Sequence, residues 1–335
     1  MKRKIDPNKY CIYIKKTNNT LNSILFPEKE NITLVIREEA LKIGFDEIGF
    51  TTASELSADR IRLKEWLNNN FHAGMSYMAN HFEKRLNPNL LEENGKSVIS
   101  VLKSYHPEND RLSTQSPKIA RYAYGKDYHA VMKEKMAKLF SFIKKTFYPD
   151  LKGRCFVDSA PLLERSLAVR AGLGWIGKNG MLINRRLGSY VFIGELVIDI
   201  DLTYNNIEEK NRCGNCSKCT EACPTKAIIG NSTVDSNKCI SYLTIENKGE
   251  IPEKYKNKLS GWIFGCDICQ EVCPWNRIAK PMNEPEFKSD KYLLEMSPND
   301  WKNISNEKFN ELFRNSAIKR TKFEGLKRNI DLSWK

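Results

Sequence analysis

The chain has 335 residues, of which 41% are hydrophobic and 28% charged, which is typical of a globular protein with two or three domains. This composition excludes intrinsic disorder, collagen and coiled coil. The 54 Lys and Arg residues exceed the 41 Asp and Glu residues, and the net charge of +13 favours a polyanionic partner. Eight of the ten cysteines fall between Cys213 and Cys273, so their placement carries more information than their number.

The sequence shows no segment that would take it into or across a membrane. No apolar stretch reaches the roughly 18 to 20 residues that a spanning helix needs. The N-terminus, MKRKIDPNKY, has no apolar region followed by a cleavage site. We therefore expect a cytoplasmic monomer with no membrane partner, whose cysteines bind metal rather than form disulfides.

Apolar spacing predicts an α+β chain with a mixed N-terminal domain. Residues 1–30 carry seven basic and three acidic side chains, and we expect an irregular arm. A helix follows from Asn31, breaks at Gly44 and gives way to a short strand. The remaining pattern predicts helices over 61–66, 73–82, 128–147 and 162–171 and strands over 96–103, 155–157, 180–184 and 189–199, the last two paired with each other.

Composition divides the rest of the chain. The mixed domain spans 31–203, and residues 204–282 are rich in Cys, Asn, Lys and Pro with little apolar periodicity, so an inorganic group must organise them. Residues 283–335 have helical patterning at 305–313 and a basic end. We expect a ferredoxin-like domain at 204–282, followed by a short helical basic segment.

The cysteine spacing is the most specific motif. Cys213, Cys216, Cys219 and Cys223 form C-x2-C-x2-C-x3-C before a proline, the run of bacterial two-cluster ferredoxins. Cys266, Cys269 and Cys273 repeat its ending, and Cys239 stands between the two motifs. In this pattern the fourth cysteine of each run reaches the other cluster. One 4Fe-4S cluster therefore takes Cys213, Cys216, Cys219 and Cys273, and the other takes Cys223, Cys239, Cys266 and Cys269.

A pair of four-cysteine zinc sites is the alternative, because zinc sites also use C-x2-C pairs. Zinc ribbons have no use for a third cysteine three residues on, nor for two C-x3-C-P endings, so the pattern favours iron–sulfur clusters. Cys11 and Cys155 lie outside the pattern. Two clusters in series conduct electrons, and the chemistry they serve should lie in the N-terminal domain.

The densest polar signal there is VDSAPLLERSLAVRAGLGWIGKNGMLI from Val157. Asp158 follows a short apolar strand, where α/β proteins commonly place reacting groups, but Asp is equally common as a helix N-cap. The residues alone leave both readings open. The G-x-G-x-x-G match at 172–177 follows a helix and precedes a strand, which is the wrong context for a dinucleotide site.

These motifs together are similar to one known family. CGNCSKCTEACP and CDICQEVCPWN, joined to VDSAPLLER, GLGWIGKN and RYAYGKDYH, closely resemble epoxyqueuosine reductase from about Asn31 to the basic C-terminus. That family reduces the epoxide of epoxyqueuosine, at the wobble position of certain tRNA anticodons, to the alkene of queuosine. It depends on cobalamin and carries two 4Fe-4S clusters. Longer members have a helical repeat extension that is absent here.

The resemblance implies roles for individual residues. Asp158 would be the catalytic proton donor, and the domain over 31–203 would bind cobalamin. The candidates for lining the corrin pocket are Arg85, Tyr122, Asp158, Ser159, Trp175, Lys178, Asn179, Gly180 and Ser241. The candidates for binding tRNA phosphates are Lys319, Arg320, Lys322, Lys327 and Arg328.

Two rival functions remain at this point. A cobalamin-dependent reductive dehalogenase would share the cofactors, but a small halide gives no reason for the +13 charge, and such enzymes commonly carry an export signal. A two-cluster electron carrier would not need the roughly 170 residues that precede the clusters. The electron donor is not identified by the sequence.

Overall fold

The computed structural model describes residues 29–106, 117–205, 209–281 and 283–333. The predicted arm over 1–30 therefore lies outside the described residues except for its last two positions, as does Cys11. Within the described part, no helix combines the length and apolar character needed to span a membrane.

A four-stranded antiparallel sheet forms the centre of the N-terminal half. Its order is β1–β2–β7–β4, with bounds Glu47–Thr52, Ser97–Ser104, Val191–Ile198 and Gly153–Phe156. Strand β2 is buried along its whole length, because helices cover both faces of the sheet. Its β-branched run SVISVLKS suits this position.

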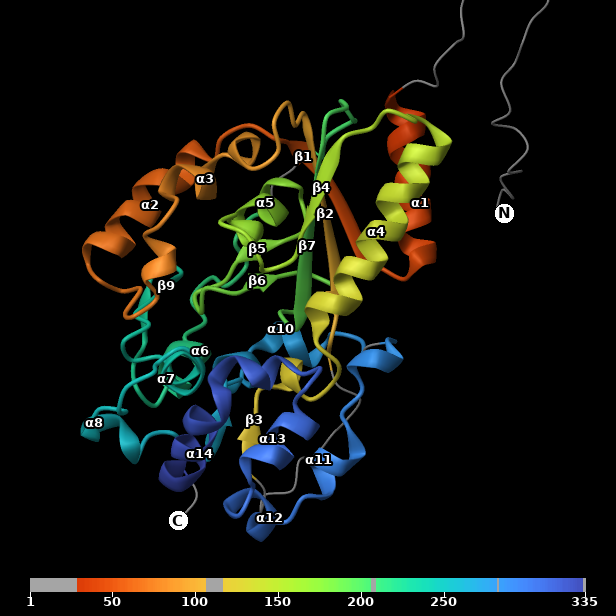
Figure 1. Cartoon of the computed structure of the whole chain (residues 1–335). Coiled ribbons are helices and arrows are strands. Elements are labelled where there is room, and N and C mark those ends of the chain that lie inside the picture. Colours follow the sequence, from red (N-terminus) through yellow and green to blue (C-terminus); the bar gives the residue numbers. More distant parts are fainter. Residues whose placement is uncertain (1–28, 107–116, 206–208, 282, 334–335) are drawn as a thin grey trace, which may run out of the picture.

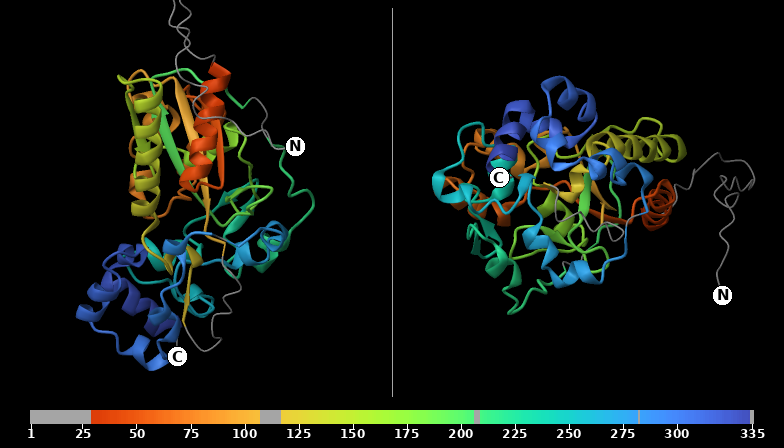
Figure 2. Two further views of the ribbon diagram at one scale, coloured as in Figure 1. Left: turned by 90° about the vertical axis from the view of Figure 1, so that its right-hand side faces the viewer. Right: turned by 90° about the horizontal axis from the view of Figure 1, so that it is seen from below.

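Two layers of helices enclose the sheet. Helices α1 (Lys29–Ile43) and α4 (Tyr128–Thr146) lie side by side on one face (Figures 1 and 2) and bury Ile36 and Met136 in the largest apolar core. The Asp127 side chain caps α4 by accepting the His129 N–H. The opposite face is covered by α2 (Ser57–Asn68), α3 (Phe82–Leu86) and α5 (Glu164–Arg170).

Helix α5 lies unusually close to the sheet. A Cβ atom on Gly49 of β1 would lie 2.2 Å from the carbonyl oxygen of Ala171, so only glycine allows this approach. Leu167 and Ala168 of α5 are fully buried against the strands. The packing of α5 against the sheet thus fixes the position of this helix.

The cysteine-rich half consists of short elements. They are α6 (Lys218–Ala222), β8 (Ile228–Gly230), β9 (Thr233–Val234), α7 (Ile240–Ile245), α8 (Glu253–Lys256), β10 (Trp262–Phe264), α9 (Ile268–Glu271) and α10 (Pro274–Arg277). Strand β10 pairs in parallel with β3 (Lys118–Ile119) from the N-terminal half. A polar network also joins the halves, since Asn276 accepts the Ser189 N–H at 2.7 Å and donates to the Ser189 hydroxyl.

The C-terminal segment is helical, as its patterning predicts. Helices α11 (Lys291–Glu295), α12 (Pro298–Lys302), α13 (Asn306–Leu312) and α14 (Lys322–Ser333) lie beyond one end of the sheet (Figure 1). They bury Trp301, Phe313 and Leu326 against residues of β3 and β10. Short 3-10 helices occupy Ser76–Met78, Pro88–Leu90, Arg121–Ala123, Pro285–Phe287 and Ala317–Thr321.

Two local predictions are wrong. The helix predicted over 73–82 is a run of turns and one 3-10 turn, in which Ala73 and His81 have positive φ. The strands predicted at 180–184 and 189–199 do not form one hairpin. Leu182–Ile183 (β6) pairs with Trp175–Ile176 (β5), whereas β7 pairs with β2 and β4. Periodicity locates a strand but does not choose its partner.

Candidate functional site

The eight clustered cysteines come together as two neighbouring groups. The Cys273 thiol lies in the electrostatic field of Cys213 and Cys219, which with burial raises its pKa. The Cys266 thiol lies in the field of Cys239 and Cys223, and burial raises its pKa further. Cys269 lies in the field of Cys239 and Cys266 and also of Cys219, so the two cysteine motifs lie close to each other; the crossed ligand sets stay a prediction. Among the described residues, no group of three or more His, Cys, Asp or Glu side chains is placed so that it could hold a metal ion.

The two cysteine loops differ in their exposure. Around Cys213–Cys219 the intervening Gly214, Asn215 and Lys218 are exposed. Between Cys266 and Cys269, Asp267 is only 2% exposed and accepts the main-chain N–H of Arg121 at 2.7 Å. The second group therefore faces the interior of the protein, next to the N-terminal domain.

Asp158 lies in the loop between β4 and α5, and two groups hold it. The Tyr128 hydroxyl donates to its Oδ2 at 2.7 Å, and its own main-chain N–H donates to Oε1 of Glu164 at 2.6 Å. Asp158 has a left-handed φ of 44° and an exposed side chain. The N-cap residue of α5 is Leu163, so Asp158 does not cap this helix.

The surroundings of Asp158 are acidic and aromatic. Burial, followed by the charge of Asp158, raises the pKa of Glu164 to about 8. The same two causes raise the pKa of Tyr128, which stacks on Phe192 with ring centroids 4.3 Å apart. Both side chains therefore stay protonated at neutral pH and add no second negative charge beside Asp158.

Two further tyrosines connect Asp158 with the rest of the molecule. Burial raises the pKa of Tyr122 most, and Asp158 and Asp267 are both among the charges that add to it. Burial likewise raises the pKa of Tyr77, with contributions from Glu246 and Asp158. The charge of Asp158 thus reaches Tyr122, which also lies in the field of Asp267, and Tyr77, whose ring lies under the Arg320 guanidinium.

Three of the candidate cofactor residues carry buried donors without a partner. Arg85 is 7% exposed, Asn179 6% and Trp175 2%. In the described part of the chain, Nε of Arg85, Nδ2 of Asn179 and Nε1 of Trp175 have no hydrogen-bond acceptor. Unpaired buried donors are costly, so these atoms suit a bound polar group that supplies acceptors.

The other candidates lie at different points of this region. Gly180 has φ 75°, and its carbonyl accepts from Arg165 at 2.5 Å. Lys178 donates to the Cys216 carbonyl at 2.9 Å and so ties the glycine-rich loop to the first cysteine group. Trp175 packs against Cys213, Cys273 and Trp275 in the same place. Ser159 is exposed beside Asp158, and Ser241 is half-buried in α7 next to Cys239.

The five basic candidates differ in whether other groups of the protein already bind their charged ends. Arg328 is half-buried and donates to the carbonyls of Leu243, Asn247 and Gly249, which fastens α14 to the loop after α7. Lys327 pairs with Asp331. Lys319 and Lys322 are exposed and form no ion pair within the described residues. Arg320 bonds Glu246 at 2.8 Å while its guanidinium lies over the Tyr77 ring.

The sequence reasoning missed several residues. Lys248 lies in the electrostatic field of Arg320, Lys322 and Arg328, although it comes from a different segment of the chain. We call Lys248 together with the five basic candidates of the C-terminal segment the basic patch. Tyr128 and Glu164 lie within RYAYGKDYH and VDSAPLLER, so the motifs included them without giving them a role. Nothing local shows that the start of α4 meets the loop after β4.

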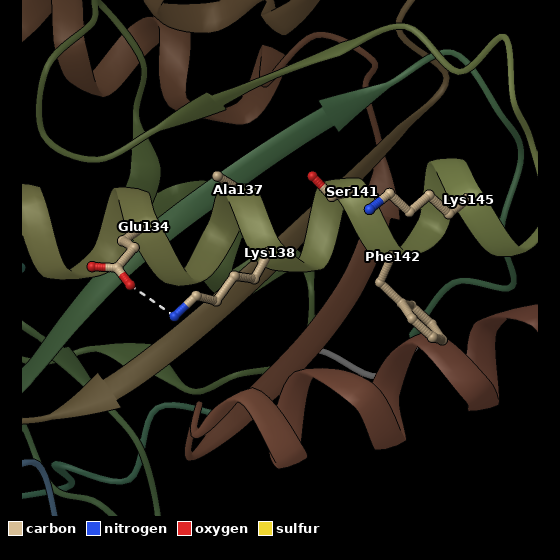
Figure 3. Close-up of a pocket in the computed structure, with 6 residues that line it drawn as sticks. All are labelled: Glu134, Ala137, Lys138, Ser141, Phe142 and Lys145. Atoms are coloured by element: carbon tan, nitrogen blue, oxygen red, sulfur yellow. Dashed lines mark hydrogen bonds and ion pairs between the residues drawn. The ribbon is translucent and has the colours of Figure 1, made fainter.

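A separate hollow lies on the outer face of α4 and is lined by Glu134, Ala137, Lys138, Ser141, Phe142 and Lys145 (Figure 3). It contains none of the candidate site residues. Glu134 and Lys138 are paired across it at 2.7 Å. We therefore locate the site at Asp158 and not here.

Comparison with known proteins identifies the family of this chain. Residues 85–159 match the family model described as "Epoxyqueuosine reductase QueG, DUF1730", and residues 212–276 match a 4Fe-4S double cluster binding domain. The epoxyqueuosine reductase of Cyclobacterium marinum is 47% identical over 302 residues, covering 90% of this chain and 96% of the relative. This chain belongs to the epoxyqueuosine reductase family.

Other members of the epoxyqueuosine reductase family show the same relationship. The Escherichia coli enzyme is 40% identical over 85% of this chain and 76% of its own length. A crystal structure of epoxyqueuosine reductase with an epoxyqueuosine-modified tRNA-Tyr stem loop has a TM-score of 0.84 at 31% identity, covering 90% of this chain and 80% of that one.

A family structure from Bacillus subtilis, with a TM-score of 0.84 at 30% identity, covers 90% of this chain and 81% of its own. It is described as having a catalytic loop, named after an aspartate, swung out of the active site. The chain is accordingly an oxidoreductase with an iron–sulfur domain.

Proposed function

We propose that this protein reduces epoxyqueuosine to queuosine at the wobble position of tRNA, with Asp158 as the proton donor. The observation that carries this proposal is the position of Asp158. After burial, the charge of Asp158 contributes to the raised pKa of Tyr122, to which Asp267 also contributes, and to that of Tyr77, whose ring lies under the Arg320 guanidinium. An electron source and a polyanion site would then both lie near this acid.

The reaction removes the epoxide oxygen as water and consumes two electrons and two protons. The carboxyl of Asp158 would give a proton to that oxygen as the C–O bond breaks. Tyr128 donates to Oδ2 of Asp158, which leaves Oδ1 free to face the substrate. Glu164 fixes the main chain of the same residue. The exposed carboxyl would become enclosed when substrate and cofactor are bound.

Cobalamin would bind in the N-terminal domain beside Asp158. The unpaired donors of Arg85, Asn179 and Trp175 would meet acceptors on the amide side chains or the phosphate tail of the cofactor. Ser159, Lys178 and Gly180 would line the same pocket, with Tyr122 and Ser241 on the side of the second cysteine group. Bound there, cobalamin would supply a strongly nucleophilic, reducible cobalt centre toward the epoxide carbon.

Two 4Fe-4S clusters would be held by the crossed cysteine sets. Cys213, Cys216, Cys219 and Cys273 would hold the cluster nearer the surface, and Cys223, Cys239, Cys266 and Cys269 the cluster nearer Asp158. The clusters would supply electrons one at a time. An electron donor of unidentified class would reduce the outer cluster. We place the enzyme in the cytoplasm, acting as a monomer.

The tRNA would approach over the basic patch. Lys319, Arg320, Lys322 and Lys248 offer charges to phosphates, and Lys327 and Arg328 add to the local field. Arg320 lies over Tyr77, so the patch continues toward Asp158. An anticodon loop bound there could place its first base at the acid.

An anaerobic assay tests the proposal. The reconstituted full chain is incubated with cobalamin, a chemical reductant and tRNA bearing epoxyqueuosine, and the nucleosides are analysed by mass spectrometry. We expect queuosine to form only when cobalamin is present. Turnover without cobalamin, or failure to retain it through gel filtration, would refute the cofactor assignment.

A further inference from the structure

We propose that Glu164 is a positioning residue that latches the Asp158 loop in its working position. The inference rests on the proposed function of Asp158 as proton donor. Glu164 does not need to touch the substrate for this role, because it acts through the main chain of Asp158.

The latch is a single short hydrogen bond between the loop before α5 and the first residue of α5. The loop over 157–163 leaves β4 and enters α5, whose first residue is Glu164. The Asp158 N–H donates to Oε1 of Glu164 at 2.6 Å. Glu164 is fixed because α5 is pressed onto the sheet at Gly49 and buries Leu167.

Such a latch suits the conformation of Asp158. Its φ of 44° lies in the left-handed region, which most residues other than glycine avoid and which Asp adopts more readily when local hydrogen bonds support it. The Tyr128 hydroxyl holds the carboxyl end of the side chain but does not fix the main chain. Without the bond to Glu164, the loop would relax to an ordinary φ and carry the carboxyl away from its position.

The protonation state of the Glu164 carboxyl suits this role. Burial and the charge of Asp158 together raise its pKa to about 8, so the group is mostly neutral at pH 7. A neutral carboxyl still accepts the N–H through its carbonyl oxygen. It therefore holds the loop without placing a second negative charge beside the proton donor.

Three variants of the full reconstituted enzyme test the latch. Glu164→Gln keeps an acceptor at the same reach, whereas Glu164→Ala removes it and Glu164→Asp withdraws it by one methylene. We expect kcat within about threefold of wild type for Glu164→Gln. For the other two we expect kcat to fall at least tenfold, with KM for the tRNA and cobalamin content unchanged, because one hydrogen bond to a polar group is worth about that factor.

The outcomes separate the latch from a purely structural role. Loss confined to KM or to cofactor content, or a Glu164→Gln variant as slow as Glu164→Ala, would overturn the inference. If Glu164→Ala does not fold, Glu164→Asp decides in its place. Asp158→Asn is measured in parallel. An inactive Asp158→Asn with normal rates for Glu164→Ala and Glu164→Asp defeats the latch alone, whereas an active Asp158→Asn defeats the proposed function itself.

Discussion

The Asp158 carboxyl is placed by a phenol that belongs to another element. Tyr128 at the start of α4 donates to Oδ2, and its ring lies flat on Phe192 of β7. The hydroxyl and the ring therefore have separable roles, one in orienting the acid and the other in the core. This separation makes Tyr128 a useful site for substitution.

Tyr128→Phe should slow the reaction without unfolding the protein. The variant loses the O–H donor to Asp158 but keeps the stack on Phe192, so we expect kcat to fall about tenfold and Tm to change by only a few degrees. Single-turnover kinetics and thermal melting followed by circular dichroism would check both. A rate equal to wild type would show that Tyr128 does not orient the acid.

Glu164 should make stability depend on pH in a defined direction. Its pKa is about 8 in the folded protein, above the ordinary value of 4.5, so between these values the folded chain binds more protons than the unfolded chain. The free energy of unfolding therefore falls as pH rises through this window. The Glu164→Gln variant has no titrating carboxyl at this position. We therefore expect the Tm of the wild type to fall relative to that of the variant as the pH rises from 5 to 8.

Melting curves at half-unit steps of pH would measure the difference. Glu195 is also buried with a raised pKa, and the Glu164 charge is one of the smaller causes of that shift, so the Tm difference between the two proteins includes this coupling as well as the titration of Glu164 itself. Parallel Tm profiles for the two proteins would contradict the expectation.

At the residue scale, the sequence predicts those features that depend on the intervals between residues along the chain. The intervals between Cys213 and Cys223 and between Cys266 and Cys273 predict the two cysteine groups, since chain geometry alone relates them. Tyr128 and Glu164 could not be assigned in this way. Their roles depend on a contact between α4, the β4–α5 loop and α5 that no local pattern encodes.

At the scale of elements, the basic residues in α14 and in the 3-10 helix before it have two different roles, although they belong to one run in the sequence. Arg328 satisfies three main-chain carbonyls from inside the fold, and Lys319 and Lys322 remain exposed. The sequence shows only a run of positive charges. Which of them face solvent follows from how α14 packs on β10 through Leu326 and Ile330.

This division predicts different results for substitutions along the run. The double variant Lys319→Ala with Lys322→Ala should weaken tRNA binding and reduce the slope of log affinity against log salt by roughly two, with Tm unchanged. Arg328→Ala should instead lower Tm, because it removes the donor from the carbonyls of Leu243, Asn247 and Gly249, at a cost of about 1 kcal/mol. Filter binding over a salt series and thermal melting would distinguish them, and an unchanged slope for the double variant would remove these lysines from the interface.

Element pairing was the weakest part of the prediction from sequence. The helices over 31–43 and 128–147 were predicted because a 3.6-residue repeat is local. The partners of β6 and β7 were not, because β7 pairs with β2, almost a hundred residues earlier in the chain. The turns at 73–82 were read as a helix because positive φ at Ala73 and His81 leaves no trace in apolar spacing.

At the scale of the molecule, main-chain and side-chain contacts join the N-terminal half to the cysteine-rich half. Strand β3 pairs with β10, and Asn276 bonds Ser189 in a buried network, so the cysteine groups are fixed relative to Asp158. Lys248 lies in the electrostatic field of Arg320, Lys322 and Arg328, so four basic residues gather where the loop after α7 meets the C-terminal segment.

The most direct test compares wild type with Asp158→Asn in the anaerobic assay. Both proteins are reconstituted with iron, sulfide and cobalamin, their cofactor content is verified by absorbance, and tRNA bearing epoxyqueuosine is analysed by nucleoside mass spectrometry after one turnover. The account predicts queuosine from wild type and at least a hundredfold slower conversion by Asp158→Asn, as expected when a general acid is lost. Conversion at the wild-type rate by an Asp158→Asn protein with full cofactor content would contradict it.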